Sequence, residues 1–214
     1  MAKVAIVTGN HKGLGRAISE FLPTIGYEIP LLIKSDEYDL REKHVCDRLV
    51  NTVLDKFGRL DLLVNNLGNY TSGRIEETLE EDWHDVMDTN LNAAFYLSHS
   101  TIKELRKHHG RIINIGFAGL EKFSPHPNVI PYTIAKTGLL TLTRGLAKAE
   151  AHHKIMVNML SPGHLENTIE PELVEKVPVG RLAKFDEALE VIKLLATTDY
   201  ITGQNIELSG GFDL

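Results

Sequence analysis

The 214-residue chain is short of cysteine, of basic clusters and of long apolar runs, and each shortage excludes a class of protein. Its one cysteine, Cys46, excludes an internal disulfide and fits a reducing compartment. A formal net charge of −6 argues against a nucleic-acid partner, because binding phosphate backbones needs clustered Lys and Arg. No apolar run approaches the ~18 residues of a membrane helix.

The sequence also lacks a recognisable signal peptide and a convincing set of metal ligands. The N-terminal "MAKVAIVTGN" enters a predicted strand at once, which leaves no room for a signal peptide. Histidine pairs stand at 108–109 and 152–153, near predicted helix ends, where we interpret them as solvated residues favoured by the helix dipole. We therefore expect a cytoplasmic protein without a membrane segment and without a metal site.

Short β-branched runs alternate with longer segments of helical periodicity along the whole chain. The expected strands are 3–8, 28–34, 60–66, 110–116, 154–160 and 205–209, and the expected helices are 14–26, 41–58, 80–108, 131–152 and 186–197. This repeated βαβ order predicts an α/β fold with one doubly wound parallel sheet covered by helices on both faces. No internal repeat or linker interrupts it, so residues 1–214 are expected to form one domain. Ligands of such sheets bind at the carboxyl ends of the strands.

A glycine-rich loop, "VTGNHKGLGRA", follows the first predicted strand and opens the first predicted helix. Gly9, Gly13 and Gly15 permit a tight turn, a close approach of the backbone to a pyrophosphate, and tight helix packing. The unpaired N–H groups at the start of the helix, around Leu14, favour a diphosphate. The loop predicts a dinucleotide site.

Tyr132 and Lys136 are four residues apart in a predicted helix, which places them on one face. Alone they would be an ordinary surface pair. Together with other motifs they resemble the short-chain dehydrogenase/reductase family, and most of all its ketoacyl-carrier-protein-reductase-like members. The motifs occur in that family's order: Thr8-Gly9-x-x-x-Gly13-x-Gly15, Asn65-Asn66-Leu67-Gly68, Asn90, Tyr132-x-x-x-Lys136, Pro162-Gly163 and the closing "ITGQ…GG". The resemblance implies a Rossmann fold, a nicotinamide cofactor, a small-molecule substrate and a homo-oligomer, dimer or tetramer.

The resemblance also implies roles for three catalytic residues. Tyr132 would donate a proton to a carbonyl or imine. Lys136 would hydrogen-bond the nicotinamide ribose and, as a cation at about 4 Å, favour the phenolate by at most a few kcal/mol. Asn90 would hold a water that links Lys136 to solvent.

The remaining family positions are implied to bind the cofactor. Asn66 and Gly68 would line the adenosine-ribose side, and Pro162 and Gly163 would line the nicotinamide. The pair Asp39-Leu40 matches the Asp-Val or Asp-Leu pair that lies beside the adenine in the family.

The type of cofactor depends on the end of the second predicted strand. There an acidic side chain would bind the ribose 2′-hydroxyl of NAD(H), but Ile33 occupies the place and cannot accept a hydrogen bond. Lys34 follows it, and Lys12 precedes Gly13, so two cations are available for a 2′-phosphate. Asp36 and Glu37 lie near, and both lysines could simply be solvated, but the pattern favours NADP(H) over NAD(H).

The chain departs from the family in two connections. Only "SDEYDL" separates the second strand from the next helix, too few residues for a parallel crossover. This predicts a sheet trimmed at the adenine-side edge and an open adenine pocket. The segment "HLENTIEPELVEK" after Gly163 is also short, which predicts a small lid, and its acidic residues are interpreted as solvated charges without a special role.

The family's catalytic serine is missing, because Phe117 stands at its position. A nearby hydroxyl such as Ser124 could replace it. Alternatively, the substrate needs no such bond, as in the serine-less, pterin-reducing dihydropteridine reductase, and Phe117 forms a substrate wall. A third hypothesis is that the protein is a non-catalytic NADP(H)-binding sensor or scaffold. Loss of one transition-state donor costs about 10²–10³ in rate, so the retained Tyr132, Lys136 and Asn90 favour an active NADPH-preferring reductase.

Overall fold

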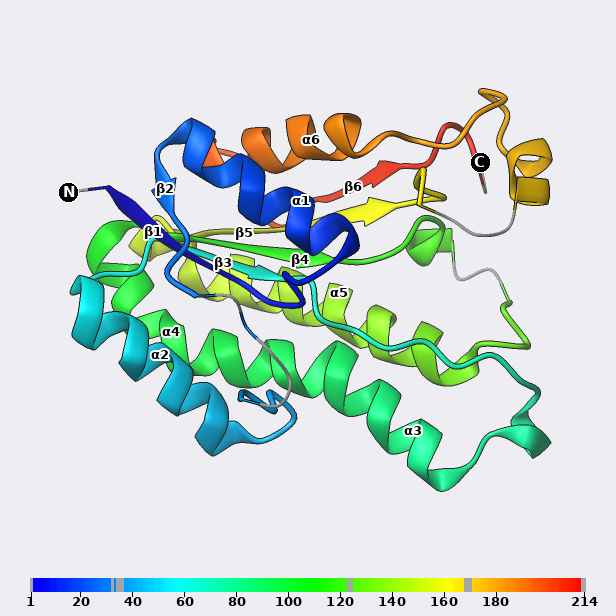
Figure 1. The fold of residues 1–214 in the computed structure, drawn as a ribbon, viewed down its shortest axis with the longest axis horizontal. Coiled ribbons are helices and arrows are strands. Elements are labelled where there is room, and N and C mark those ends of the chain that lie inside the picture. Colours follow the sequence, from blue (N-terminus) through cyan, green and yellow to red (C-terminus); the bar gives the residue numbers. More distant parts are fainter. Residues whose placement is uncertain (1, 32, 34–36, 123–124, 168–170, 213–214) are drawn as a thin grey trace.

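The computed structural model describes residues 2–31, 33, 37–122, 125–167 and 171–212 of the chain (Figure 1). Six parallel strands form one sheet in the order β2-β1-β3-β4-β5-β6. The strands are β1 (Lys3–Val7), β2 (Tyr27–Glu28), β3 (Leu62–Asn65), β4 (Arg111–Ile115), β5 (Met156–Pro162) and β6 (Asn205–Leu208). The predicted doubly wound α/β fold is confirmed.

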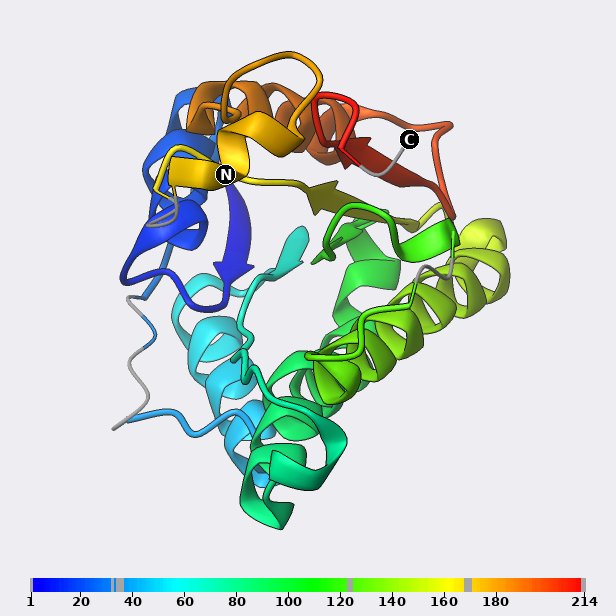
Figure 2. The same ribbon diagram turned by 90° about the vertical axis from the view of Figure 1, so that its right-hand side faces the viewer.

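Helices cover both faces of this sheet (Figures 1 and 2). On one face lie α1 (Gly13–Phe21) and α6 (Phe185–Thr197), and on the other lie α2 (Lys43–Phe57), α4 (Ala93–His108) and α5 (Ile130–Glu150). The central strands β3 and β4 are buried along their whole length. Burial on both faces explains why the strands are nearly continuous apolar runs. Across the described residues, no helix combines the length and the apolar character needed to cross a membrane.

Two helix ends show how local sequence sets a boundary. The helix predicted at 41–58 is α2, which ends at Phe57 and is capped by Gly58. Gly58 has φ of +69° and its N–H is bonded to the Leu54 carbonyl, as expected for a glycine C-cap. The helix predicted at 14–26 is shorter: α1 ends at Phe21 and continues as the 3₁₀ turn Leu22–Ile25. Pro23 lacks the N–H that an α-helix would need there.

The second predicted strand, 28–34, is wrong in its extent. Only Tyr27 and Glu28 pair with β1, which leaves a two-residue strand at the edge of the sheet. Pro30 has no N–H group to donate to a hydrogen bond with the neighbouring strand. Beyond Pro30, the described backbone is bonded to the side chain of Asn10 and not to β1. Asn10 donates to the Leu31 carbonyl at 3.0 Å and accepts from the Ile33 N–H at 2.9 Å. Within the described residues, the trimmed edge that the sequence predicts is present.

The helix predicted at 80–108 is interrupted. It consists of α3 (Glu80–Met87), a π-helical turn η3 (Asp88–Asn92) and α4. The Asn90 side-chain amide donates to the Val86 carbonyl at 2.9 Å, which is the carbonyl that the backbone N–H of residue 90 would bond in an α-helix. A side chain therefore widens the helix at the residue that the sequence predicts to be functional. Short 3₁₀ turns complete the chain: η2 (Ile75–Glu77), η4 (Leu120–Lys122), η5 (Ala151–His153) and η6 (Pro171–Lys176).

Candidate active site

The glycine loop lies between β1 and α1, at the carboxyl edge of the sheet. Gly9 has φ of +62° and Gly13 has φ of +53°. Residues other than glycine rarely adopt this backbone conformation. At Gly15 a Cβ atom would lie 2.3 Å from the Gly9 carbonyl oxygen and 2.4 Å from Asn66 Nδ2. The backbone of this loop is packed so closely that glycine is required for steric reasons.

Thr8 and Asn66 join this loop to the end of β3. Thr8 Oγ1 accepts the backbone N–H groups of Asn66 at 2.9 Å and Leu67 at 2.8 Å. The Asn66 side chain donates to the carbonyls of Thr8 at 3.0 Å and Gly9 at 3.3 Å. Both Asn66 bonds hold the loop in shape.

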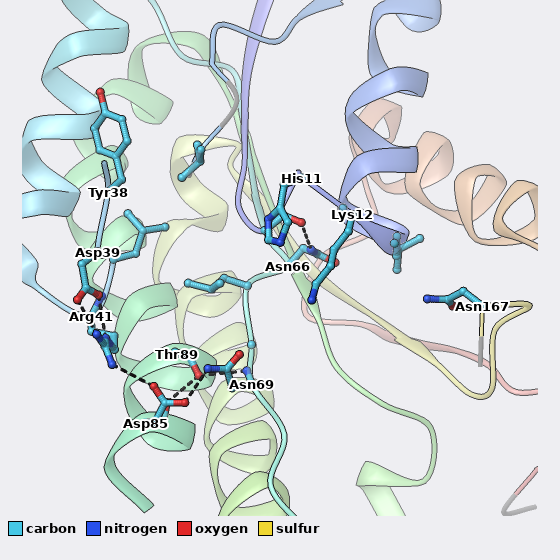
Figure 3. Close-up of a pocket in the computed structure, with 18 residues that line it drawn as sticks. His11, Lys12, Tyr38, Asp39, Arg41, Asn66, Asn69, Asp85, Thr89 and Asn167 are labelled. Carbon is cyan, nitrogen blue, oxygen red and sulfur yellow. Dashed lines mark hydrogen bonds and ion pairs between the residues drawn. The ribbon is translucent and has the colours of Figure 1, made fainter. Parts of the chain in front are cut away.

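A groove of about 910 Å³ opens in front of the loop (Figure 3). Nine of the residues that the sequence assigns to the cofactor line it: Gly9, Lys12, Gly13, Leu14, Gly15, Asp39, Leu40, Asn66 and Gly68. Ile33 lines it too, whereas Lys34 and Ser124 lie outside the described residues. Tyr132, Lys136, Pro162 and Gly163 do not line this groove.

One wall of the groove carries residues that sequence reasoning missed. The Arg41 guanidinium forms two hydrogen bonds to Asp39, at 2.9 and 2.7 Å, and a third to Asp85 at 3.1 Å (Figure 3). The guanidinium lowers the pKa of the Asp39 carboxyl. The sequence "DLR" signals the first contact, but nothing in the sequence pairs residue 41 with residue 85.

Helix α5 places Tyr132 and Lys136 side by side, as predicted. Lys136 Nζ lies 5.6 Å from the centroid of the Tyr132 ring and donates to the Ile115 carbonyl at 2.7 Å. Burial lowers the pKa of Lys136 to about 8, and burial together with the nearby Tyr70 raises the pKa of Tyr132 to about 12. The lowering of the Tyr132 pKa that the sequence predicts is not found in the protein without cofactor, where burial of the phenol is the larger effect.

Asn90 completes this group of side chains. Its Nδ2 donates to three acceptors, but its buried Oδ1 has no partner within the described parts of the chain. A Cβ atom on Gly68 would lie 2.2 Å from this oxygen and 3.5 Å from Lys136 Nζ. The oxygen and the ammonium therefore approach the chain from the same side of Gly68.

Aromatic side chains surround Tyr132. The Phe117 ring lies 5.4 Å from the Tyr132 ring with a tilt of 33°, and Tyr70 meets Tyr132 edge-on at 5.4 Å. His126 packs edge-on against Phe117 at 5.6 Å. Neither Tyr70 nor His126 had a signal in the sequence that would assign it to the site. Phe117 forms an aromatic wall beside the phenol.

Pro162 and Gly163, at the end of β5, lie beside the connection that carries Phe117. The Pro162 carbonyl accepts the Ala118 N–H at 3.0 Å. At Gly163 the N–H donates to the Leu208 carbonyl at 2.9 Å, and a Cβ atom would lie 3.1 Å from the Ser209 Cα atom. The two residues therefore lie beside Ala118 and β6 and are not among the residues that line the groove.

These features fit a dinucleotide at the carboxyl edge of the sheet. The glycine loop and Gly68 line the groove, and the Asn90 oxygen, which has no partner among the described residues, lies behind Gly68. A doubly wound sheet with this loop and a Tyr/Lys pair defines the class of dinucleotide-binding oxidoreductases. The chain matches the family described as "Enoyl-(Acyl carrier protein) reductase" over residues 2–213. It belongs to the short-chain dehydrogenase/reductase family and is an NAD(P)-dependent oxidoreductase of that type.

Curated relatives agree with this assignment. The chain is 30% identical over 240 aligned positions to the 3-oxoacyl-(acyl-carrier-protein) reductase of Haemophilus influenzae, covering 99% of this chain and 98% of the relative. It is 31% identical over 241 positions to that of Escherichia coli, covering 98% and 96%. Both alignments are longer than the chain, so these relatives contain residues that it lacks.

Solved structures agree as well. A blue fluorescent protein from a metagenomic library, in complex with NADPH, is 26% identical with a TM-score of 0.89, covering 99% of this chain and 98% of that one. The 3-ketoacyl-(acyl-carrier-protein) reductase of Brucella melitensis, complexed with NADH, shares the fold with a TM-score of 0.90 at 23% identity, covering 99% and 98%. The chain is therefore a short-chain reductase with a nicotinamide cofactor and a small-molecule substrate.

Proposed function

We propose that this chain is an NADPH-preferring reductase of a small carbonyl or imine compound, with Tyr132 as the proton donor. The observation that carries the proposal is the convergence of Tyr132, Lys136 and the Asn90 oxygen beside the groove. The reduced nicotinamide supplies the hydride when it is bound. All of residues 1–214 are taken as one domain serving this reaction.

The roles of the chain's own residues follow from their positions. Gly9, Gly13 and Gly15, with the start of α1, would hold the pyrophosphate, since N–H groups there face an anion. Asp39 and Leu40 would hold the adenine side. Farther along the edge, Lys136 would hold the nicotinamide ribose, and Pro162 and Gly163 would lie against the nicotinamide.

The Tyr132 phenol is protonated at neutral pH, so it can act as the proton donor in a reduction. Burial raises its pKa to about 12, which makes it a weaker acid than a free tyrosine, and the charge of Lys136 would offset this effect during proton transfer. Lys136, with a pKa of about 8, still carries most of its charge at pH 7. Lys136 would stabilise the phenolate left after proton transfer. Asn90 Oδ1 would accept a hydrogen bond from the water that links Lys136 to solvent.

The NADPH preference is supported by Lys12. Its side chain is exposed and lines the groove. Ile33 occupies the position at which an acidic side chain would bind the ribose 2′-hydroxyl of NAD(H). The opposite wall carries Arg41, which is paired with both Asp39 and Asp85, so that this wall has one net negative charge and no unpaired cation among these three residues. Lys12 therefore offers a 2′-phosphate the clearest cation on the groove surface.

The first experiment measures NADPH consumption against a panel: a ketoacyl thioester, simple aldehydes and ketones, and a quinonoid dihydropterin. Tyr132→Phe should lose at least about 100-fold in kcat, because a positioned general acid contributes about 10²–10⁴, while the Kd for NADPH stays within about twofold. Tyr200→Phe, at a residue 98% exposed, is the matched control. Unchanged turnover in Tyr132→Phe would overturn the mechanism.

A second experiment tests the cofactor. Lys12→Ala should raise the Kd for NADPH about tenfold more than the Kd for NADH, because only the 2′-phosphate loses a charge-assisted bond. The same is expected for Lys34→Ala. Lys43→Ala, which removes an exposed lysine on α2 paired with Asp47, is the control. Equal losses for the two cofactors would contradict the preference.

The aromatic wall supports one substrate chemistry over others. Phe117 and Tyr70 offer ring faces and edges on two sides of Tyr132, which suits a flat conjugated ring better than a flexible chain. A dihydropterin, the substrate class of the serine-less dihydropteridine reductase, is therefore the preferred member of the panel.

The second candidate function is a non-catalytic NADP(H) sensor or scaffold. It is favoured by Phe117, an apolar ring that stands where the family places a hydroxyl and packs against the phenol. Tight NADPH binding without turnover of any panel member would select it.

The oligomer and the location also belong to this proposal. We take the protein to be a homo-oligomer on the strength of the exposed apolar residues on α4 and α5, such as Phe95 and Ile134. We place it in the cytoplasm because its single cysteine, Cys46, is an unpaired and buried thiol.

A further inference from the structure

Asn90 can act in a relay only if its amide is held in one orientation. Three acceptors hold the Nδ2 end: the Asn69 carbonyl at 2.7 Å, the Val86 carbonyl at 2.9 Å and Thr89 Oγ1 at 3.3 Å. A flip of the amide would point Oδ1 at two carbonyl oxygens and lose these bonds. These acceptors therefore direct the oxygen of Asn90 toward the Lys136 side of Gly68.

Two of these acceptors are themselves held by Asp85. The Asp85 carboxylate accepts the side-chain amide of Asn69 at 2.6 Å, and its backbone carbonyl accepts the Thr89 hydroxyl at 2.7 Å. The Asn69 backbone N–H donates to Thr89 Oγ1 at 3.1 Å, which closes the ring of contacts. The Asp85 carboxylate therefore holds Asn69, whereas the Asp85 backbone carbonyl holds Thr89.

The other oxygen of the Asp85 carboxylate accepts Arg41, which is also bound to Asp39 (Figure 3). Asp39, Arg41, Asn69, Asp85 and Thr89 all line the nucleotide groove. One line of hydrogen bonds therefore runs from the adenine-side wall of the groove to the amide of Asn90.

We propose that Asn69 and Asp85 are positioning residues that orient the Asn90 amide toward Lys136, with Arg41 anchoring Asp85 to the wall of the groove. The inference rests on the proposed function for the catalytic meaning of Asn90, but the orientation itself exists in the protein without cofactor. The Arg41 and Asp85 side chains are 46% and 34% exposed. Pairs this exposed contribute little to folding, so variants at these positions should fold.

The test observes the Asn90 side-chain NH₂ group directly, by amide proton exchange in ¹⁵N-labelled full-length protein without cofactor. The Asn90→Asp variant, which lacks this group, assigns the signal. Asp85→Ala and Asn69→Ala should each speed the exchange about tenfold, which corresponds to about 1.4 kcal/mol of lost protection. Asp85→Glu, which keeps both carboxylate oxygens, should restore slow exchange. Lys43→Ala, also an exposed cation paired with an aspartate, should leave it unchanged.

Steady-state kinetics provides a second measurement that tests the inference. With the best panel substrate, both alanine variants should lower kcat about tenfold, while the KM for the cofactor changes less than twofold. Exchange that stays at the wild-type rate in both variants overturns the inference, and so does a change in cofactor KM alone. Because exchange needs no turnover, failure of the proposed function, seen as unchanged activity in Tyr132→Phe, is distinguishable from failure of this inference.

Discussion

Lys136 is the residue where function and stability conflict most directly. Its side chain is 4% exposed, and its ammonium is bonded to the Ile115 carbonyl. Burial lowers its pKa from the ordinary value of 10.5 to about 8, so the folded protein binds this proton less tightly than the unfolded chain. The charged form of Lys136, which the proposed reaction uses, is therefore a source of instability below pH 8.

This difference predicts a pH dependence of folding. Between pH 8 and 10.5 the unfolded chain keeps the Lys136 proton and the folded chain loses it, so stability rises with pH in that window. The free energy of unfolding of wild type relative to Lys136→Met should increase by about 2 kcal/mol from pH 7.5 to 9.5. Urea unfolding at the two pH values measures it.

Above pH 10 the Tyr132 pKa of about 12 acts in the opposite direction. The folded phenol then keeps a proton that the unfolded chain releases, so stability falls with rising pH. The comparison with Lys136→Met is therefore made below pH 10. A difference that stays constant between the two pH values would show that Lys136 titrates normally.

At the scale of elements, the same residue type has opposite effects in two helices. Gly15, in the first turn of α1, leaves 2.3 Å between an added Cβ and the Gly9 carbonyl oxygen, whereas Gly145, within α5, has no atom within 4 Å of one. The first glycine is required by contact with another segment. The second is required by nothing in the described structure and weakens its helix.

Alanine at these two sites should therefore change stability in opposite directions. Gly15→Ala should destabilise by about 1–3 kcal/mol through overpacking and weaken cofactor binding. Gly145→Ala should stabilise by about 0.5–1 kcal/mol through helix propensity. Denaturant unfolding measures both, and a stability change of the same sign in the two variants would contradict the argument.

At the scale of the whole molecule, exposed apolar side chains point to self-association. Phe95 on α4 is 49% exposed and Ile134 on α5 is 44% exposed, and the two helices lie on the same face of the sheet (Figure 2). Sedimentation of the wild type should give a dimer or tetramer. Phe95→Glu should shift it toward the monomer, because a buried unpaired charge is strongly unfavourable.

Ile75→Glu, at a residue 63% exposed in η2, is the control and should keep the wild-type mass. A wild type that sediments as a monomer at micromolar concentration would remove the proposed homo-oligomer. The identity of the cofactor and the fold would be unaffected by that result.

Features that depend on spacing along the chain could be predicted from sequence. The alternation of strands and helices follows from apolar periodicity, and the Gly58 cap, the glycine loop and the Tyr132–Lys136 pair follow from residues a few positions apart. The shortened connection before α2 predicted the trimmed sheet edge for the same reason, because chain length limits what a crossover can reach.

Features that depend on contacts between distant segments could not be predicted. Asn10 holds the chain that follows β2 through its bonds to Leu31 and Ile33, and the Arg41–Asp85 pair joins residues 44 positions apart in the groove wall. The raised pKa of Tyr132 likewise follows from burial among neighbours brought by other segments. The spacing of residues along the chain is known from the sequence alone. Desolvation and long-range hydrogen bonds arise only when tertiary packing brings side chains from distant segments together.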